Sequence, residues 1–192
     1  MSEDNIALTL ISKAERALTI SERLSLAKEE VFMTFFHHSV SAGLIAYRLA
    51  KLVEKSLINT IRHRQIAELV RKYNNTTFPQ LCFSLCLLHD INKLKGITRK
   101  RIKEIIHELI GSCDDETVNI VLQLAAATEG GEAKGLPPIF SDLIVPIIAL
   151  GDYLASQKTV DAYRELVTGN NRYSMHFKRL STLTGLRLAE LR

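Results

Sequence analysis

The chain has 192 residues, of which 46% are hydrophobic and 24% are charged, a composition typical of a globular protein. No apolar run reaches the roughly 18 residues that a membrane span needs, and the acidic start Met1–Asp4 is unlike a signal peptide. An odd number of cysteines without CxxC spacing argues against a disulfide framework and a zinc knuckle, and favours a cytoplasmic setting. The net charge of +4 is compatible with nucleic acid as a partner but is not diagnostic of it.

Apolar residues at helical spacing dominate the first part of the chain. A first helix is predicted over residues 6–18, and Ser21 is expected to cap a short second one. A long pattern over residues 31–57 predicts a third helix, and residues 59–73 predict a fourth. The first 73 residues are therefore predicted to be helical almost throughout.

The next predicted helix leads to the most informative stretch of the sequence. Thr77 is expected to cap it, and Pro79 falls in its first turn, where a missing N–H costs little. The apolar run that follows carries Cys82 and Cys86, four residues apart, as small hydrophobic side chains. We expect this helix to run into an adjacent histidine and aspartate and to be broken by Gly96.

Similar signals predict further helices over the approximate ranges 98–110, 114–128, 139–156 and 160–167, followed by a leucine-rich tail over residues 172–192. Pro146 should kink or split the third of these. No convincing strand, repeat or long linker is present. The sequence therefore predicts a single all-α domain over residues 1–192, a bundle of about eight to ten helices.

The adjacent pair His89 and Asp90 is followed three residues later by Lys93. Imidazole nitrogen and carboxylate oxygen are good ligands for mid-series divalent metals. At a helix end the pair could serve one ion, or two ions with Asp90 as a bridge. The alternative interpretation is that His89 is an ordinary core histidine and Asp90 a polar residue at a helix end.

Two other helices each place one ligand-type residue in an apolar pattern. His38 lies on the apolar face of its predicted helix, whereas its neighbour His37 lies on a mixed face. A buried histidine satisfied within the core would also fit this position. Asp152 interrupts the apolar segment 145–155, and a buried carboxylate needs a cation or strong donors. A metal would be the simplest partner of Asp152, and an arginine from elsewhere in the fold is the alternative.

The order of His38, His89-Asp90 and Asp152 on a helical chain resembles the HD superfamily of metal-dependent phosphohydrolases. Residues 38–46 resemble the family's first-ligand helix, which selects His38 over His37. Residues 87–93 are similar to the usual Leu-Leu-His-Asp-Ile-Gly-Lys, with Asn92 in place of the glycine, and residues 151–156 are similar to the last-ligand segment. The resemblance covers residues 35–156. It implies that His38, His89, Asp90 and Asp152 bind a divalent transition metal, Mn²⁺, Ni²⁺, Co²⁺ or Fe²⁺, or else Mg²⁺.

Other features resemble one branch of this superfamily, the HD nuclease domains of CRISPR effectors. They are Asn92, the segment Gly135–Pro137, and the tail that begins at Arg172. The closest resemblance is to the N-terminal HD domain of the large polymerase-like subunit of type I-D systems. It implies cleavage of single-stranded DNA in antiviral defence, other CRISPR effector subunits as partners, and a tail over residues 172–192 that leads into a following domain.

One departure from related nucleases leaves the number of metal ions open. CRISPR helicase-associated HD nucleases carry a His-His pair where this chain has Ala-Thr-Glu-Gly-Gly at residues 127–131. Glu129 could substitute as an oxygen ligand, or it is a solvated loop acid. His107 and His37 are the other candidates for an accessory site, and for His107 a helix-surface histidine is the alternative.

The resemblance also implies roles for two residues next to the expected metal. Asp90 would orient the attacking water in addition to binding metal. Lys93 would stabilise charge in the transition state or protonate the leaving oxygen, and its alternative is an ordinary surface lysine.

A basic run directly after this motif is the sequence's clue to a substrate. It comprises Lys95, Arg99, Lys100, Arg101 and Lys103. Such a run would hold a phosphate backbone next to the cleavage site, unless it is only a solvated helix face. A nucleotide phosphohydrolase and a vestigial metal-binding module that serves as a docking surface are the alternatives to a nuclease.

Overall fold

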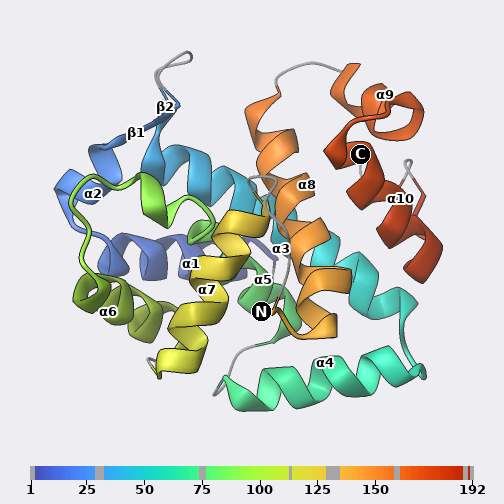
Figure 1. Cartoon of the computed structure of the whole chain (residues 1–192), viewed down its shortest axis with the longest axis horizontal. Helices are drawn as coiled ribbons and strands as arrows, with labels where there is room; N and C mark the ends of the chain where they lie inside the picture. The colour runs from blue at the N-terminus through green and yellow to red at the C-terminus, as the bar shows by residue number, and fades with distance from the viewer. Residues whose placement is uncertain are drawn as a thin grey trace.

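The computed structural model describes residues 3–28, 33–73, 77–112, 114–128, 135–157, 161–187 and 190, and these ranges contain ten α-helices (Figure 1). The helices are α1 (Glu3–Ala17), α2 (Ile20–Leu24), α3 (Phe35–Ser56), α4 (Ile61–Lys72), α5 (Phe78–Leu87), α6 (Arg99–Ile110), α7 (Asp115–Thr128), α8 (Val145–Ser156), α9 (Asp161–Thr168) and α10 (Arg172–Thr184). The predicted all-α fold of about eight to ten helices is confirmed. None of the described helices is both long and apolar enough to cross a lipid bilayer.

The prediction that the chain has no strand was wrong in one place. Strands β1 (Leu26–Lys28) and β2 (Met33–Thr34) pair antiparallel between α2 and α3, with Leu26 opposite Thr34. Strands of two and three residues are too short to display the alternation of apolar and polar residues by which a strand is recognised in a sequence. Strand β2 is followed directly by α3.

Threonine caps account for much of the accuracy of the predicted boundaries. The hydroxyls of Thr77 and Thr98 accept hydrogen bonds from backbone N–H groups three residues later, at the starts of α5 and α6. Gly111 ends α6 in the left-handed conformation, with φ of 75°. The start of α2 was misplaced, because Thr19 rather than Ser21 is its N-cap.

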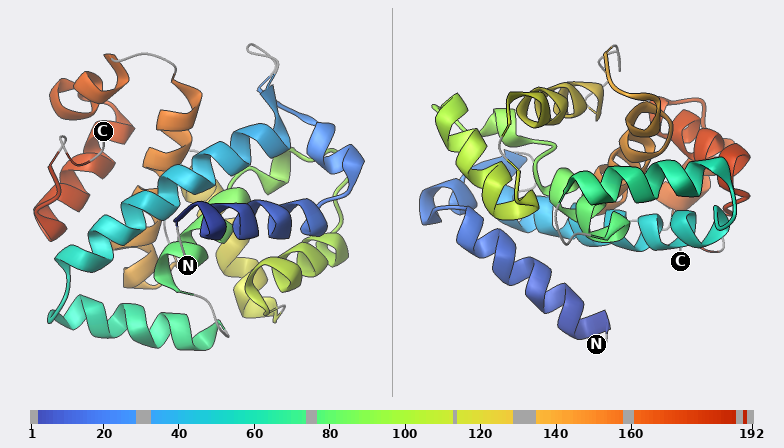
Figure 2. Two further views of the ribbon diagram at one scale, coloured as in Figure 1. Left: turned by 180° about the vertical axis from the view of Figure 1, so that it is seen from behind. Right: turned by 90° about the horizontal axis from the view of Figure 1, so that it is seen from below.

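Helix α3 forms the centre of the bundle and packs against both α5 and α8. Figure 2 shows α3 crossing the molecule from behind, with α6 and α10 on opposite flanks. Two glycines let these helices approach closely. A Cβ at Gly43 would lie 2.9 Å from the Phe83 ring, and a Cβ at Gly151 would lie 2.8 Å from the Ala42 carbonyl oxygen. The backbones of three helices are therefore brought together at one place.

The segment before α8 is interrupted near Pro146, as predicted. A π-helical turn, η3 (Phe140–Ile144), precedes α8, and Pro146 lies in the first turn of that helix. Because proline has no N–H, the regular helical ladder cannot continue through it. Beyond the interruption, residues 145–154 are all buried.

Cys82 and Cys86 are free and completely buried in α5, as expected for small hydrophobic side chains. Cys113 lies outside the described residues.

Candidate metal centre

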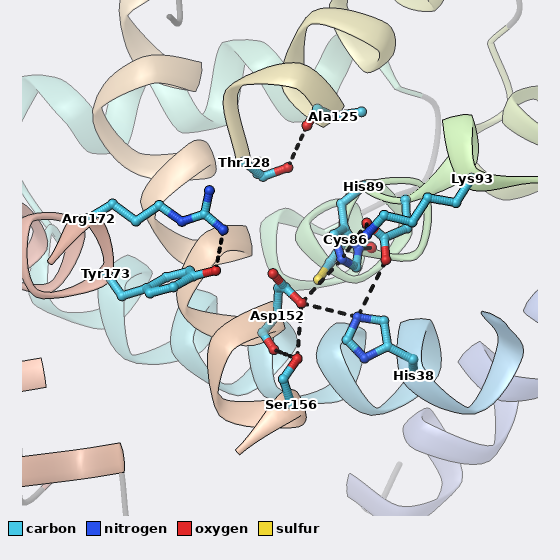
Figure 3. Close-up of polar contacts among 11 residues, drawn as sticks. His38, Cys86, His89, Lys93, Ala125, Thr128, Asp152, Ser156, Arg172 and Tyr173 are labelled. Carbon is cyan, nitrogen blue, oxygen red and sulfur yellow. Dashed lines mark hydrogen bonds and ion pairs between the residues drawn. The ribbon is translucent and has the colours of Figure 1, made fainter. Parts of the chain in front are cut away.

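Four side chains predicted as ligands converge between α3, α5 and α8, and Figure 3 labels three of them, His38, His89 and Asp152. Nε2 of His38 lies 3.1 Å from Oδ1 of Asp152 and 3.6 Å from Oδ2 of Asp90. Nε2 of His89 lies 3.4 Å from Oδ1 of Asp90 and 3.6 Å from Oδ1 of Asp152. His38, His89 and Asp90 are almost completely buried, and Asp152 is 9% exposed.

The cluster has the spacing of a metal-binding group. Ligand atoms about 2.1 Å from one ion, separated by tetrahedral or octahedral angles, lie roughly 3.0–3.4 Å apart. His38, His89 and Asp90 each offer an atom within 4.8 Å of the other two, and Oδ1 of Asp152 is within ion-pair distance of both histidines. His38, His89 and Asp90 could therefore hold a metal ion, and Asp152 lies beside them.

Missing hydrogen bonds give an independent reason to infer an ion. Nε2 of His38, Nε2 of His89 and Oδ2 of Asp90 are buried and have no hydrogen-bond partner. Leaving buried polar atoms unpaired is unfavourable, and most such atoms in folded proteins have a partner. All three point into the same cluster, so one cation would satisfy them together.

The end of α5 explains how neighbouring residues both reach the cluster. The prediction that the helix runs into His89 and Asp90 needs correction, because α5 ends at Leu87 and is followed by a turn and a short 3₁₀ helix, η2 (Ile91–Lys93). Adjacent residues on a continuous α-helix do not share a face. The tighter turn, with the N–H of His89 bonded to the Cys86 carbonyl at 3.2 Å, is what lets both side chains face inward.

Hydrogen bonds from surrounding groups orient two of the ligands. Nδ1 of His89 lies 2.6 Å from the Cys86 carbonyl, so we assign the proton to Nδ1 and the lone pair to Nε2. The Ser156 hydroxyl bonds to the Asp152 backbone oxygen at 2.8 Å and to its Oδ1 at 3.3 Å. Cys86 and Ser156 were not recognised as site residues in the sequence. The only available signal was their position, three residues before His89 and one turn after Asp152.

Lys93 contacts the site directly, with its ammonium 2.6 Å from Oδ1 of Asp90. This places a positive charge on one oxygen of that carboxylate and leaves the other, Oδ2, without a hydrogen bond. Burial disfavours a charged His89 ring, but contacts with Asp152, Cys86 and Asp90 outweigh burial, and the pKa of His89 is raised well above 6.5 without an ion. Binding of a cation at Nε2 of His89 would therefore compete with protonation of the ring.

The proposed accessory residues do not join the cluster. His37 and His107 are both exposed, and neither belongs to the group formed by His38, His89 and Asp90. The backbone N–H of His37 bonds to the Thr34 hydroxyl at the start of α3. Glu129 lies outside the described residues.

Two residues of the basic run form ion pairs with an acidic residue, and two others lie at exposed positions. Arg99 and Lys103 both contact Asp115, at 3.2 and 3.0 Å, and Lys95 and Lys100 are exposed. No pattern in the sequence indicated the role of Arg101, whose shortest contacts are with residues far away in the chain.

Arg101 ties α6 to the first two helices. Its guanidinium makes two 2.8 Å hydrogen bonds to the Glu22 carboxylate and one of 2.7 Å to the Ala17 carbonyl. The hydrogen bond from Arg101 lowers the pKa of Glu22, even though partial burial acts in the opposite direction. These contacts satisfy Arg101 within the fold, so it is a structural residue rather than a free phosphate-binding group.

No protein-family model, curated protein or solved structure matches this chain.

Proposed function

We propose that this chain is a divalent-metal-dependent phosphodiesterase of the HD type that cleaves single-stranded DNA in a CRISPR effector complex. The observation that carries the proposal is the convergence of His38, His89, Asp90 and Asp152, with three of their polar atoms buried and unpaired. Mixed imidazole and carboxylate ligation suits a mid-series transition ion. The HD order of these residues supports phosphoester hydrolysis as the reaction.

When bound, a divalent ion supplies a water of lowered pKa and polarises the phosphoryl oxygen. Asp90 holds one side of the site, with Oδ2 directed toward His38 and Oδ1 paired with Lys93. The Lys93 side chain is 37% exposed, so in this proposal its ammonium reaches a phosphate oxygen while it stays near Asp90. In this proposal Lys93 stabilises the negative charge that grows on the phosphoryl group or on the leaving oxygen.

The surface next to the cluster supports a polyanionic substrate. The chain leaves the site at Lys93 and passes through exposed Lys95 to the start of α6, where Lys100 is also exposed. Exposed lysines near a cleavage site attract a phosphate backbone by a salt-dependent electrostatic effect. We propose that the nucleic acid approaches the cluster across this segment.

The proposal is tested with purified protein, fluorescent single-stranded DNA and Mn²⁺, Ni²⁺, Co²⁺ or Mg²⁺. We expect cleavage by the wild type, and a loss of orders of magnitude in Asp90→Ala, because the variant lacks both a ligand and the group that orients water. His107→Ala is the matched control, since His107 is exposed and outside the cluster. Circular dichroism checks that both variants are folded.

Three results would contradict the proposal. Residual cleavage by Asp90→Ala above roughly a tenth of the wild-type rate would show that Asp90 is not required for metal-assisted hydrolysis. Absence of wild-type cleavage with every ion, together with retained metal binding, would instead favour a docking module. Hydrolysis of mononucleotides but not of DNA would assign the site to a nucleotide phosphohydrolase.

A further inference from the structure

A tyrosine pair connects α10 to the helix that carries Asp152. Tyr153 directly follows Asp152 in α8, and its ring stacks on Tyr173 with a centroid distance of 4.4 Å and an interplanar angle of 25°. The Tyr153 hydroxyl donates a 2.7 Å hydrogen bond to the Glu165 carboxylate, and this bond fixes the hydroxyl end of the Tyr153 ring. The start of α10 is therefore fixed next to the candidate metal centre.

The neighbouring Arg172 is oriented by this tyrosine pair. Its guanidinium carbon lies 4.6 Å from the centroid of the Tyr173 ring, and its Nη2 donates a hydrogen bond to the Tyr173 hydroxyl. An arginine that both stacks on an aromatic ring and bonds to its hydroxyl loses little further freedom when it binds an anion.

Figure 3 shows where the Arg172 side chain is directed. The guanidinium extends toward the space between Thr128, at the end of α7, and the Asp152 carboxylate. Lys93 enters the cluster from the opposite side, where it contacts Asp90. In this view a cation from α10 and a cation from η2 therefore lie on opposite sides of the labelled ligands His38, His89 and Asp152.

This arrangement suits a phosphate group rather than a neutral substrate. The planar guanidinium can present two parallel N–H donors to two phosphate oxygens, whereas the Lys93 ammonium acts as a point charge. A phosphate bound at the cluster would meet one cation on each side. The tyrosine pair would keep Arg172 aligned for this contact.

Building on the proposed function, we infer that Arg172 binds a non-bridging oxygen of the substrate phosphate, on the side of the metal centre opposite Lys93. The ligand class is a phosphomonoester or phosphodiester, and inorganic phosphate is its smallest representative. The inference is independent of nucleic-acid sequence, because a phosphate contact carries no base information.

The experiment measures phosphate binding rather than turnover. Protein loaded with Mn²⁺ is titrated with inorganic phosphate, and the ³¹P line broadening caused by the bound paramagnetic ion is followed. We expect Arg172→Gln to weaken phosphate affinity by about tenfold or more, the usual size of a lost charge-assisted hydrogen bond. Arg172→Lys should fall between wild type and Arg172→Gln, because it keeps the charge but loses the planar fork.

Lys178→Gln is the matched control. Lys178 lies on the same helix, is exposed and bonds to the Gly169 carbonyl at 3.3 Å, so its substitution removes the same charge without touching the tyrosine pair. Affinity for Mn²⁺, measured in parallel, should be the same in all variants, which also shows that each is folded.

The outcomes separate the two proposals. If wild type binds Mn²⁺ and broadens the phosphate signal but Arg172→Gln binds phosphate equally well, only the assignment of Arg172 is overturned. Equal weakening by Lys178→Gln would also overturn it, because the effect would then be one of net charge. If wild-type protein binds no Mn²⁺, or binds it without broadening the phosphate signal, the proposed function fails and the assignment fails with it.

Discussion

Nε2 of His38 and Oδ1 of Asp152 lie 3.1 Å apart, yet Nε2 of His38 takes part in no hydrogen bond. The two atoms are at the separation expected of neighbouring ligands on one ion, about 3.0–3.4 Å. A shared cation would account for this arrangement.

The first prediction concerns metal preference. Two imidazoles and two carboxylates should bind Mn²⁺, Co²⁺ or Ni²⁺ more tightly than Ca²⁺, which prefers six to eight oxygen ligands. Calorimetric titration tests this, and Ca²⁺ binding as tightly as Mn²⁺ would contradict it. His38→Ala should abolish the binding and His107→Ala should leave it intact, since His107 is outside the cluster.

Metal binding should also appear as added stability of the fold. At about 100 times the dissociation constant, an ion that binds only the folded state raises the free energy of unfolding by about 2.7 kcal/mol. Urea unfolding of the wild type with and without Mn²⁺ measures this rise. In Asp152→Ala the rise should largely disappear.

The raised pKa of His89 predicts how stability depends on pH. Its contribution to the metal-free fold is fully present below the unfolded-state pKa of 6.5 and is lost as pH rises through the higher folded-state pKa. In the presence of a chelator, the free energy of unfolding should therefore fall as pH increases from about 6.5 to 8. The histidine contribution is identified by its absence in His89→Asn.

Addition of Mn²⁺ should change the sign of this trend. Ligands must be deprotonated to bind the ion, so metal affinity increases with pH and stabilises the fold more strongly at pH 8 than at pH 6.5. A pH dependence that is the same with Mn²⁺ and with chelator would show that His89 is not a ligand.

Arg101 and Lys100 are adjacent but should respond very differently to substitution. Arg101→Ala should lower the free energy of unfolding by about 1–3 kcal/mol, because it removes the guanidinium that bonds to the Glu22 carboxylate and the Ala17 carbonyl. Lys100→Ala, at an exposed position, should stay within about 0.5 kcal/mol of wild type. Urea unfolding compares the two.

Charge reversal at the two exposed lysines, Lys95 and Lys100, tests whether they attract nucleic acid. Lys100→Glu together with Lys95→Glu should reduce the salt dependence of single-stranded DNA binding, because fewer counterions are released. An unchanged slope of affinity against salt concentration would show that these two exposed lysines are only solvated.

Gly151→Ala should be more damaging than Gly43→Ala. The new methyl group at residue 151 would lie 2.8 Å from the backbone oxygen of Ala42, whereas at residue 43 its nearest contact, at 2.9 Å, is a side-chain atom, in the ring of Phe83. Overpacking of this kind typically costs about 1–3 kcal/mol. Thermal unfolding gives the order of the two variants, and a lower metal affinity in Gly151→Ala would show that α8 has moved away from α3.

The sequence predicted those parts of the fold that depend on local signals. Thr77 and Thr98 begin α5 and α6 as expected, because a capping hydroxyl acts on N–H groups only three residues away. The expectation that the four cluster residues lie together is met, since each combines a ligand-type side chain with an apolar helical setting or the HD motif, and their role as ligands stays a prediction.

Features that depend on tertiary contacts were beyond the sequence. The hydrogen bonds of Arg101 to Glu22 join residues 79 apart, and no local pattern reveals them. The turn after Leu87 is another such case, because the apolar run continues to Leu88 and carries no helix-stop signal. The stacking of Tyr153 on Tyr173 likewise depends on how α8 and α10 pack.

A bound ion would also cross-link parts of the chain that are far apart in the sequence. His38, His89 and Asp152 come from α3, the end of α5 and α8, so a bound ion would close two long loops in the polypeptide. In an unfolded chain, closing such loops carries an entropic penalty that grows slowly with their length. The complete ligand set should therefore form only once these helices have packed, and an ion held by it should slow unfolding, because all the cross-links must be released before the helices can separate.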